Sequence, residues 1–188
     1  SYTRGNWRNT AFSAPMIMAK SCHDLDLLQQ YASAKCESLS SVGDLTWFKR
    51  ENAPDVCADR CVDCKYIERC AYSAKYRYLD LWKADNKPQC WPYDVLSVGT
   101  LTEDVLAKAI QEGPYGRCVY RCDNNVADHQ SVQMRFANGI TATFNATAFT
   151  KAMGRITVFR FGAGELLYEE EKGMIIENPF RGDNVVRS

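Results

Sequence analysis

Residues 131–149, SVQMRFANGITATFNATAF, predict a β-hairpin. Val132, Met134 and Phe136 alternate with polar residues, which is typical of a strand that buries one face. Asn138 and Gly139 follow, and an Asn-Gly pair between two strand-like runs is the strongest short signal for a tight hairpin turn. The C-terminal part of the chain is therefore expected to be an antiparallel sheet.

Further strand-like runs lie on both sides of this hairpin. They are CESLSSVGDLTWF at 36–48, RITVFRF at 155–161, GELLYEE at 164–170 and KGMIIEN at 172–178, with glycines at the turns. The opening residues, SYTRGNW at 1–7, also fit a strand. Together these runs predict a meander of neighbouring antiparallel strands.

The predicted helices come earlier in the chain. PMIMAKSCHDLDLLQQYAS at 15–33 begins with a proline, which suits a first helical turn. Its apolar face, at helical spacing, comprises Ile17, Met18, Cys22, Leu25 and Leu28. SAKYRYLDLW at 73–82 predicts a short helix. Thr100 and Glu103 form a capping-box pattern before another helix, which Gly113-Pro114 ends. The order predicts an α+β fold, with helices on one face of an open, mostly antiparallel β-sheet.

Composition limits the classes of function. The 188 residues suit a single domain, 1–188, with a cysteine-rich insertion at 50–73. The 23 basic and 23 acidic side chains leave no net charge, so neither nucleic acid nor a membrane surface is an expected partner. The opening residues lack the apolar core of a secretory signal. Nine cysteines, an odd number in a mid-sized chain, favour a cytoplasmic protein with reduced or metal-bound thiols.

Four of the cysteines lie in CADRCVDCKYIERC, residues 57–70. Cys57, Cys61, Cys64 and Cys70 could close a tetrahedral zinc site around the Cys-x-x-Cys pair. The polar loop cannot bury much apolar area, so a metal would supply its order. An iron–sulfur cluster fits the spacing less well, and free thiols in a flexible loop are the remaining alternative.

Two other segments are candidates for chemistry. His23, with Lys20 and Asp26 three residues to either side, forms a stripe on one side of the first helix. A nearby carboxylate can orient an imidazole for proton transfer. The alternative is a surface histidine in a stripe of solvated charges, which the same sequence also fits. GPYGRCVYRCDNNVADHQ, at 113–130, could line a polyol pocket or form a solvated turn. Its candidate substrate contacts are Tyr115, Arg117, Asp123, Asn124, Asp128 and His129.

Three segments, taken in this order, resemble the C-terminal domain of the Gfo/Idh/MocA oxidoreductases, the glucose–fructose oxidoreductase and inositol dehydrogenase family. They are NWRNTAFSAPMIMAKSCHDLDLL, CVDCKYIERCAYSAKYRYLD and GPYGRCVYRCDNNVADHQSVQMRFANGITATFNATAF. The resemblance implies that NAD or NADP is held mainly by an N-terminal Rossmann domain absent from this chain. The chain itself has no G-x-G-x-x-G segment. It would then be the domain that binds a sugar or polyol and forms a homo-oligomer through its sheet, inactive in isolation.

The resemblance also assigns roles to residues. His23 and Asp26 match the end of a family motif similar to G-G-x-x-x-D-x-G-x-H-x-x-D, which implies that His23 takes the proton from a substrate hydroxyl. Ala19 replaces the upstream aspartate and Ser21 the glycine, so Lys20 is the candidate to take part of the missing role. Trp7 and Arg8, in the first matching segment, are further candidates for substrate contact.

A different class of function fits the same residues. The chain could be a stand-alone binding or assembly module, stabilised by zinc, without catalysis. Apolar residues occur at both odd and even positions of the predicted strands, so both faces of the sheet carry them. This favours a sheet with one face buried against a partner.

Overall fold

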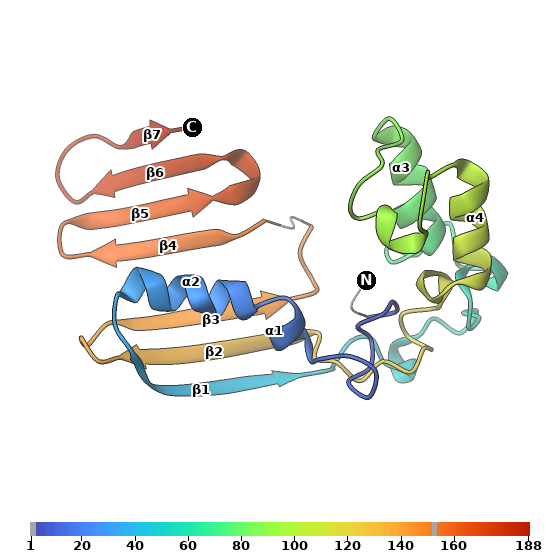
Figure 1. Ribbon diagram of the computed structural model, residues 1–188, viewed down its shortest axis with the longest axis horizontal. Coiled ribbons are helices and arrows are strands. Elements are labelled where there is room, and N and C mark those ends of the chain that lie inside the picture. The colour runs from blue at the N-terminus through green and yellow to red at the C-terminus, as the bar shows by residue number, and fades with distance from the viewer. Residues whose placement is uncertain (1–2, 152–153) are drawn as a thin grey trace. The chain divides into compact units, whose positions relative to one another are not determined.

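The computed structural model describes residues 3–151 and 154–188 (Figure 1). The chain divides into two compact units, Ser1–Ala148 and Phe149–Ser188. Helices and open antiparallel sheets occur together, which confirms the α+β class. The prediction of a single domain with an insertion stays a prediction.

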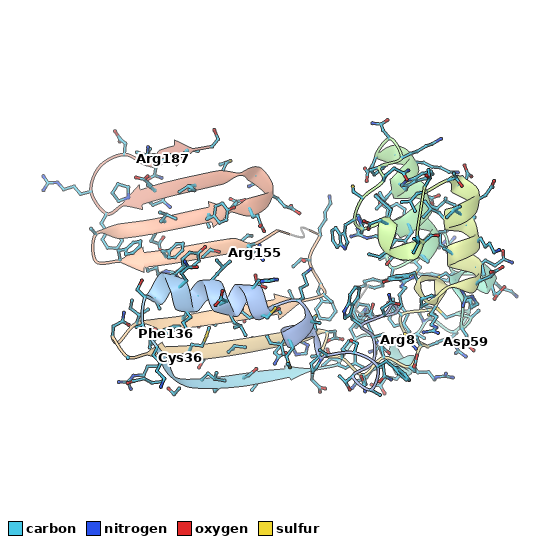
Figure 2. The ribbon with its side chains drawn as sticks, in the orientation of Figure 1. Arg8, Cys36, Asp59, Phe136, Arg155 and Arg187 are labelled. Atoms are coloured by element: carbon cyan, nitrogen blue, oxygen red, sulfur yellow. The ribbon has the colours of Figure 1, made fainter. Side chains whose placement is uncertain are left out.

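The first unit contains a three-stranded antiparallel sheet. Its order is β1 (Cys36–Asp44), β2 (His129–Phe136) and β3 (Thr141–Thr147). The hairpin between β2 and β3 confirms the Asn-Gly prediction, since Gly139 has φ +84°, a conformation that glycine adopts without strain. At the hairpin end, Cys36 of β1 pairs with Phe136 (Figure 2).

Two helices cover one face of this sheet. The predicted helix over 15–33 is interrupted at Lys20–Ser21, giving α1 (Met16–Ala19) and α2 (Cys22–Ala32). The core between helix and sheet contains Val132, Met134 and Phe136, packed against Ile17, Leu25 and Leu28. Met18 and Cys22 of the predicted apolar face are exposed, because the interruption turns them away from this core.

The remaining helices of the first unit form their own cores. A π-helical turn (Tyr76–Asp80) continues into α3 (Leu81–Ala84), and α4 spans Glu103–Glu112. The shorter turns are 3-10 helices at Arg50–Asn52, Cys61–Asp63, Asp94–Leu96 and Pro114–Gly116. The buried side chains here are Trp82, Tyr93, Leu101 and Leu106 in one cluster and Cys61, Ala74, Tyr78, Ile110 and Tyr115 in another. These helices pack on each other and on the cysteine loop instead of on the sheet.

Two local predictions were wrong. The N-cap of α4 is Thr102, not Thr100, because the Thr102 hydroxyl accepts a hydrogen bond from the Val105 N–H at 3.3 Å. Residues 3–7 form turns rather than a strand: the Thr3 carbonyl accepts a hydrogen bond from the Cys122 thiol, and the Gly5 carbonyl accepts one from the nearby Arg8 guanidinium. Residues 1 and 2 lie outside the described part.

The second unit is a four-stranded antiparallel sheet. The strands β4 (Ile156–Phe161), β5 (Gly164–Glu169), β6 (Met174–Pro179) and β7 (Val185–Arg187) pair in chain order, with a 3-10 turn at Glu170–Lys172. The first three strands confirm the predicted meander, whereas β7 was not predicted. Across the residues that the structure describes, no helix has the length and apolar character needed to cross a membrane.

Candidate functional site

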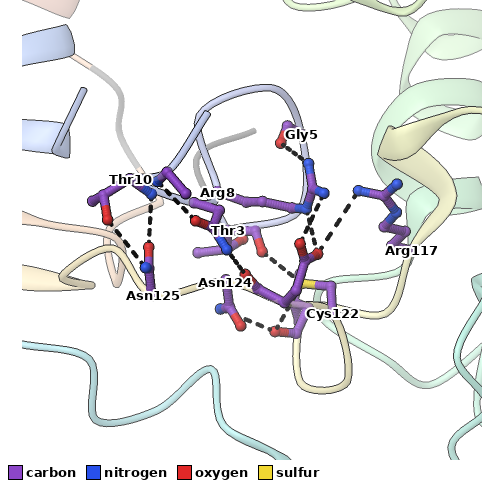
Figure 3. Close-up of polar contacts among 12 residues, drawn as sticks. Thr3, Gly5, Arg8, Thr10, Arg117, Cys122, Asn124 and Asn125 are labelled. Carbon is purple, nitrogen blue, oxygen red and sulfur yellow. Dashed lines mark hydrogen bonds and ion pairs between the residues drawn. The ribbon is translucent and has the colours of Figure 1, made fainter. Parts of the chain in front are cut away.

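The N-terminal segment docks on the end of the 113–130 segment (Figure 3). The Asn9 side-chain amide donates to the Asp123 carbonyl at 2.7 Å, and the Asn125 backbone N–H donates to the Arg8 carbonyl at 2.9 Å. Asn125 and Thr10 exchange two further hydrogen bonds at 2.8 and 3.0 Å. The two segments are more than 100 positions apart in sequence, yet they form one polar surface. We call this surface, residues 3–10 with 117–125, the polar junction.

Charges of both signs meet in the polar junction. The Arg8 guanidinium donates to both carboxylate oxygens of Asp123, at 2.6 and 3.0 Å, and this fork holds the pKa of Asp123 below its usual value. The Arg117 guanidinium lies 4.0 Å from the same carboxylate. Its buried Nη1 makes no hydrogen bond to any described residue. Arg117 is therefore a second cation beside the Asp123 carboxylate, and 35 % of its side chain is exposed at the surface of the junction.

Other predicted contact residues of this region have structural roles. Asn124 donates to the backbone carbonyls of Phe48 and Val119, at 3.0 and 3.4 Å, so its amide nitrogen is used inside the protein. Tyr115 is buried and packs edge to face on Tyr78, with ring centroids 5.8 Å apart. Trp7 is half-buried beside Arg8 in the junction. The sequence placed these residues in one segment but could not separate surface groups from core groups.

Asp128 and His129 form a second polar centre at the beginning of β2. Asp128 is completely buried, and its carboxylate accepts backbone N–H groups from Thr46, Trp47 and Phe48 at 3.0, 2.7 and 3.3 Å. Burial acts to raise the pKa of this carboxyl, but the hydrogen bonds from His129 and from the three N–H groups outweigh it, so the pKa is lowered. Asp128 thereby fixes the turn that follows β1.

The His129 ring is held by that carboxylate. Its Nδ1 lies 2.9 Å from the Asp128 Oδ1, while 43 % of the side chain remains exposed. A buried carboxylate behind a part-exposed imidazole is the arrangement that orients a histidine for proton transfer. The sequence had assigned this pair only to substrate contact.

His23 lies on the exposed side of α2. It is the second residue of that helix, and Lys20, His23 and Asp26 are all exposed. No hydrogen bond or ion pair joins His23 to another of the described residues. Figure 1 shows α1 and the beginning of α2 over the end of the sheet at which β1 ends and β2 begins. The two histidines of the chain thus lie towards the same end of this layer.

The cysteine loop is more ordered than its composition suggests. Cys61 and Cys64 are buried, Cys57 and Cys70 are half-buried, and the Cys64 N–H donates to the Cys61 carbonyl at 3.2 Å across a 3-10 turn. Burial raises the pKa of the Cys57 thiol to about 12, and the nearby Cys118 and Cys64 thiols add to this shift. Among the residues described, no three His, Cys, Asp or Glu side chains are grouped as ready metal ligands.

The loop is anchored to α4 through Arg60. Its Nη2 donates to the carbonyls of Ile110 and Gly113, each at 2.8 Å, which satisfies acceptors at the helix C-terminus. Gly116 allows this approach, because a Cβ there would lie 1.6 Å from the Ile110 oxygen. Sequence analysis missed two residues that contact the cysteine loop, Cys118 and the buried Arg4. A signal for Cys118 was present: Cys118 and Cys122 repeat the C-x3-C spacing of Cys57 and Cys61.

Comparison of the chain with protein-family models, with curated proteins and with solved structures finds no match. The case for a function therefore rests on the residues and contacts described above.

Proposed function

We propose that the chain is the substrate-binding and oligomerisation domain of an NAD(P)-dependent oxidoreductase acting on a sugar or polyol hydroxyl. The observation that carries this proposal is the polar junction, where the part-exposed Arg117 guanidinium lies beside the Arg8–Asp123 pair. Convergent charged and amide groups of this kind fix the orientation of a ligand with many hydroxyls. NAD or NADP would be bound mainly by a Rossmann domain outside these 188 residues.

The proposed role of His23 rests on the family resemblance, and its exposure on α2 supports that role. The exposed His23 accepts the proton of the substrate hydroxyl, with Lys20 and Asp26 on the same side of the helix. A bound NAD or NADP would supply the hydride acceptor for the carbon that bears this hydroxyl. Arg117 and Asp123 hold neighbouring hydroxyls, which sets the reacting carbon in place. The nine cysteines form no disulfide, and this supports the proposal of a reducing, cytoplasmic setting.

The direct test uses the protein encoded by the whole gene. We expect the whole protein to form NAD(P)H with at least one member of a panel of sugars, inositols and amino sugars. The absorbance of NAD(P)H measures this reaction. The isolated 188-residue chain is the control and should give no turnover. Failure of the whole protein to bind NAD or NADP, measured by calorimetry, would overturn the proposal. Clear turnover by the isolated chain would contradict the proposal that the cofactor is bound mainly outside these 188 residues.

A second candidate, an assembly module without catalysis, is favoured by one observation on the second unit. Within the described residues of this unit, no α-helix covers either face of the sheet. Exposed apolar side chains occur on alternate positions of β4, at Ile156 and Val158, and on the opposite face at Phe161. Phe159 and Phe161 are stacked, with centroids 6.3 Å apart. A sheet with such faces favours burial against another copy of the chain.

Both candidates share a self-association prediction, which sedimentation velocity can check. We expect the protein to sediment as a dimer or larger homo-oligomer, and Phe161→Asp to shift it towards monomer by placing a charge on the apolar face. Arg181→Asp, at an exposed position between β6 and β7, is the matched control and should leave the oligomer intact. A monomeric parent protein at micromolar concentration would rule out assembly through this sheet.

A further inference from the structure

The segment that carries Cys118 is tied to the cysteine loop at three points. The Cys118 N–H donates to the Asp59 carbonyl at 2.9 Å, between the first two loop cysteines. Arg60 and Arg117 form an isolated antiparallel bridge, and Arg121 donates to the Asp59 carboxylate at 2.7 Å. Cys118 is buried at 6 % exposure. These contacts hold a fifth cysteine against a loop that contains four.

The two segments also share one part of the hydrophobic core. Cys57 and Cys118 pack around the same aromatic cluster, with Phe48, Tyr72 and Tyr120. Cys118 is thus a cysteine outside the loop whose backbone and side chain both lie against it.

A buried cation lies beside these sulfurs. Arg4 is 5 % exposed, and its Nη1 donates to the Cys61 Sγ at 3.4 Å, while its Nη2 donates to the Tyr72 carbonyl. No carboxylate pairs with Arg4 among the residues that the structure describes. A buried guanidinium without a negative partner is costly, and a neutral thiol is only a weak acceptor. A sulfur cluster with net negative charge would supply the missing partner.

We propose that Cys118 and three of the four loop cysteines bind one zinc ion. Four thiolates around Zn²⁺ form a closed tetrahedral site with a net charge of about −2, which Arg4 offsets through its N–H to sulfur contact. On binding, each of the four thiols gives its proton to solvent and forms one sulfur–zinc bond, with no change of oxidation state. Because no three of these thiols are already grouped as ready ligands among the described residues, binding requires the sulfurs to move towards one another.

Such a site would connect distant parts of the first unit. Cys118 follows Arg117, the residue of the polar junction that lies 4.0 Å from the Asp123 carboxylate, so zinc fixes the backbone from which that guanidinium extends. The metal would have no open position for a substrate, because all four positions are taken by protein sulfur. Its role is to hold the loop, α4 and the 113–130 segment as one body.

The test is metal content, by plasma mass spectrometry, of the whole protein purified without a metal-affinity column. We expect about one zinc per chain in the parent, as a four-cysteine site requires, and almost none in Cys118→Ser. Cys90→Ser removes an exposed cysteine outside the site and should retain full zinc. Among single serine variants of Cys57, Cys61, Cys64 and Cys70, three should lose zinc and one should keep it. Full zinc in Cys118→Ser, or iron in place of zinc in the parent, overturns the assignment.

A second measurement covers the case in which Cys118→Ser does not fold. Cobalt replaces zinc in tetrahedral sites, and the intensity of its thiolate charge-transfer absorption scales with the number of bound sulfurs. The parent, reconstituted with Co²⁺, should show the intensity of four thiolates, and Cys118→His should show that of three while keeping the metal. A parent spectrum without thiolate bands would contradict the proposal independently of any variant.

Discussion

Asp128→Ala should lower the free energy of unfolding of the first unit by about 3–5 kcal/mol. The substitution leaves the backbone N–H groups of Thr46, Trp47 and Phe48 without the carboxylate that accepts them. Asp128 has no exposed surface, so water cannot readily replace the lost acceptor. Urea unfolding followed by tryptophan fluorescence is a suitable measurement, because all four tryptophans lie in this unit.

The matched control is Asp44→Ala. Asp44 also accepts a backbone N–H, from Leu45 at 2.7 Å, but it is exposed at the end of β1. Water can take its place, so this variant should lose much less stability than Asp128→Ala. Equal losses in the two variants would mean that burial of the Asp128 carboxylate is not the source of its effect.

The lowered pKa of Asp128 also determines the direction in which the free energy of unfolding changes with pH. The folded state favours the ionised carboxylate, so its contribution is fully present above the unfolded pKa of about 3.9 and is lost as pH falls through the lower folded value. The parent should therefore lose unfolding free energy as pH falls below 4. Asp128→Asn, which cannot ionise, should show a flatter profile; an unchanged slope would show that other carboxylates govern acid unfolding.

The strands of this protein were predictable because local chemistry and tertiary structure agree there. Val132, Met134 and Phe136 alternate and are buried, and the Asn-Gly turn requires the positive φ that Gly139 has. The helix over 15–33 was predicted as one piece, yet it is interrupted at Lys20–Ser21, where Ser21 is buried. Hydrophobic periodicity predicts which face of a helix is apolar, but it does not show where along the chain the helix is interrupted.

The candidate site was predictable only as a list of residues near one another in sequence. The Arg8–Asp123 pair joins positions 115 apart, and the Arg4–Cys61 contact joins positions 57 apart. No local pattern specifies such pairs, because they depend on how the chain folds back on itself. Asp128 and Asp123 look alike in sequence, but one is completely buried and the other is exposed. Burial separates an aspartate that fixes the backbone from one that can meet a ligand.

Under the proposed function, His23→Ala in the whole protein should reduce kcat by about 10²–10⁴-fold, the range expected when a general base is removed. The substitution should leave stability nearly unchanged, since His23 is exposed on α2 and has no hydrogen-bond partner among the described residues. Gln30→Ala, at an exposed position of the same helix, is the matched control and should retain parental turnover. Steady-state kinetics with saturating cofactor, together with a thermal melt of each variant, would measure both effects.

The same experiment weighs His23 against the chain's other histidine. His129 has the buried carboxylate of Asp128 behind its Nδ1, which is the support that His23 lacks. If His23 is the base, His129→Gln should lower stability through Asp128 while the turnover of the folded fraction stays near the parental value. Near-normal turnover in His23→Ala with a heavy loss in folded His129→Gln would instead transfer the proton-accepting role to His129. The split between kcat and stability therefore assigns the base, because only one of the two imidazoles is tied into the core of the first unit.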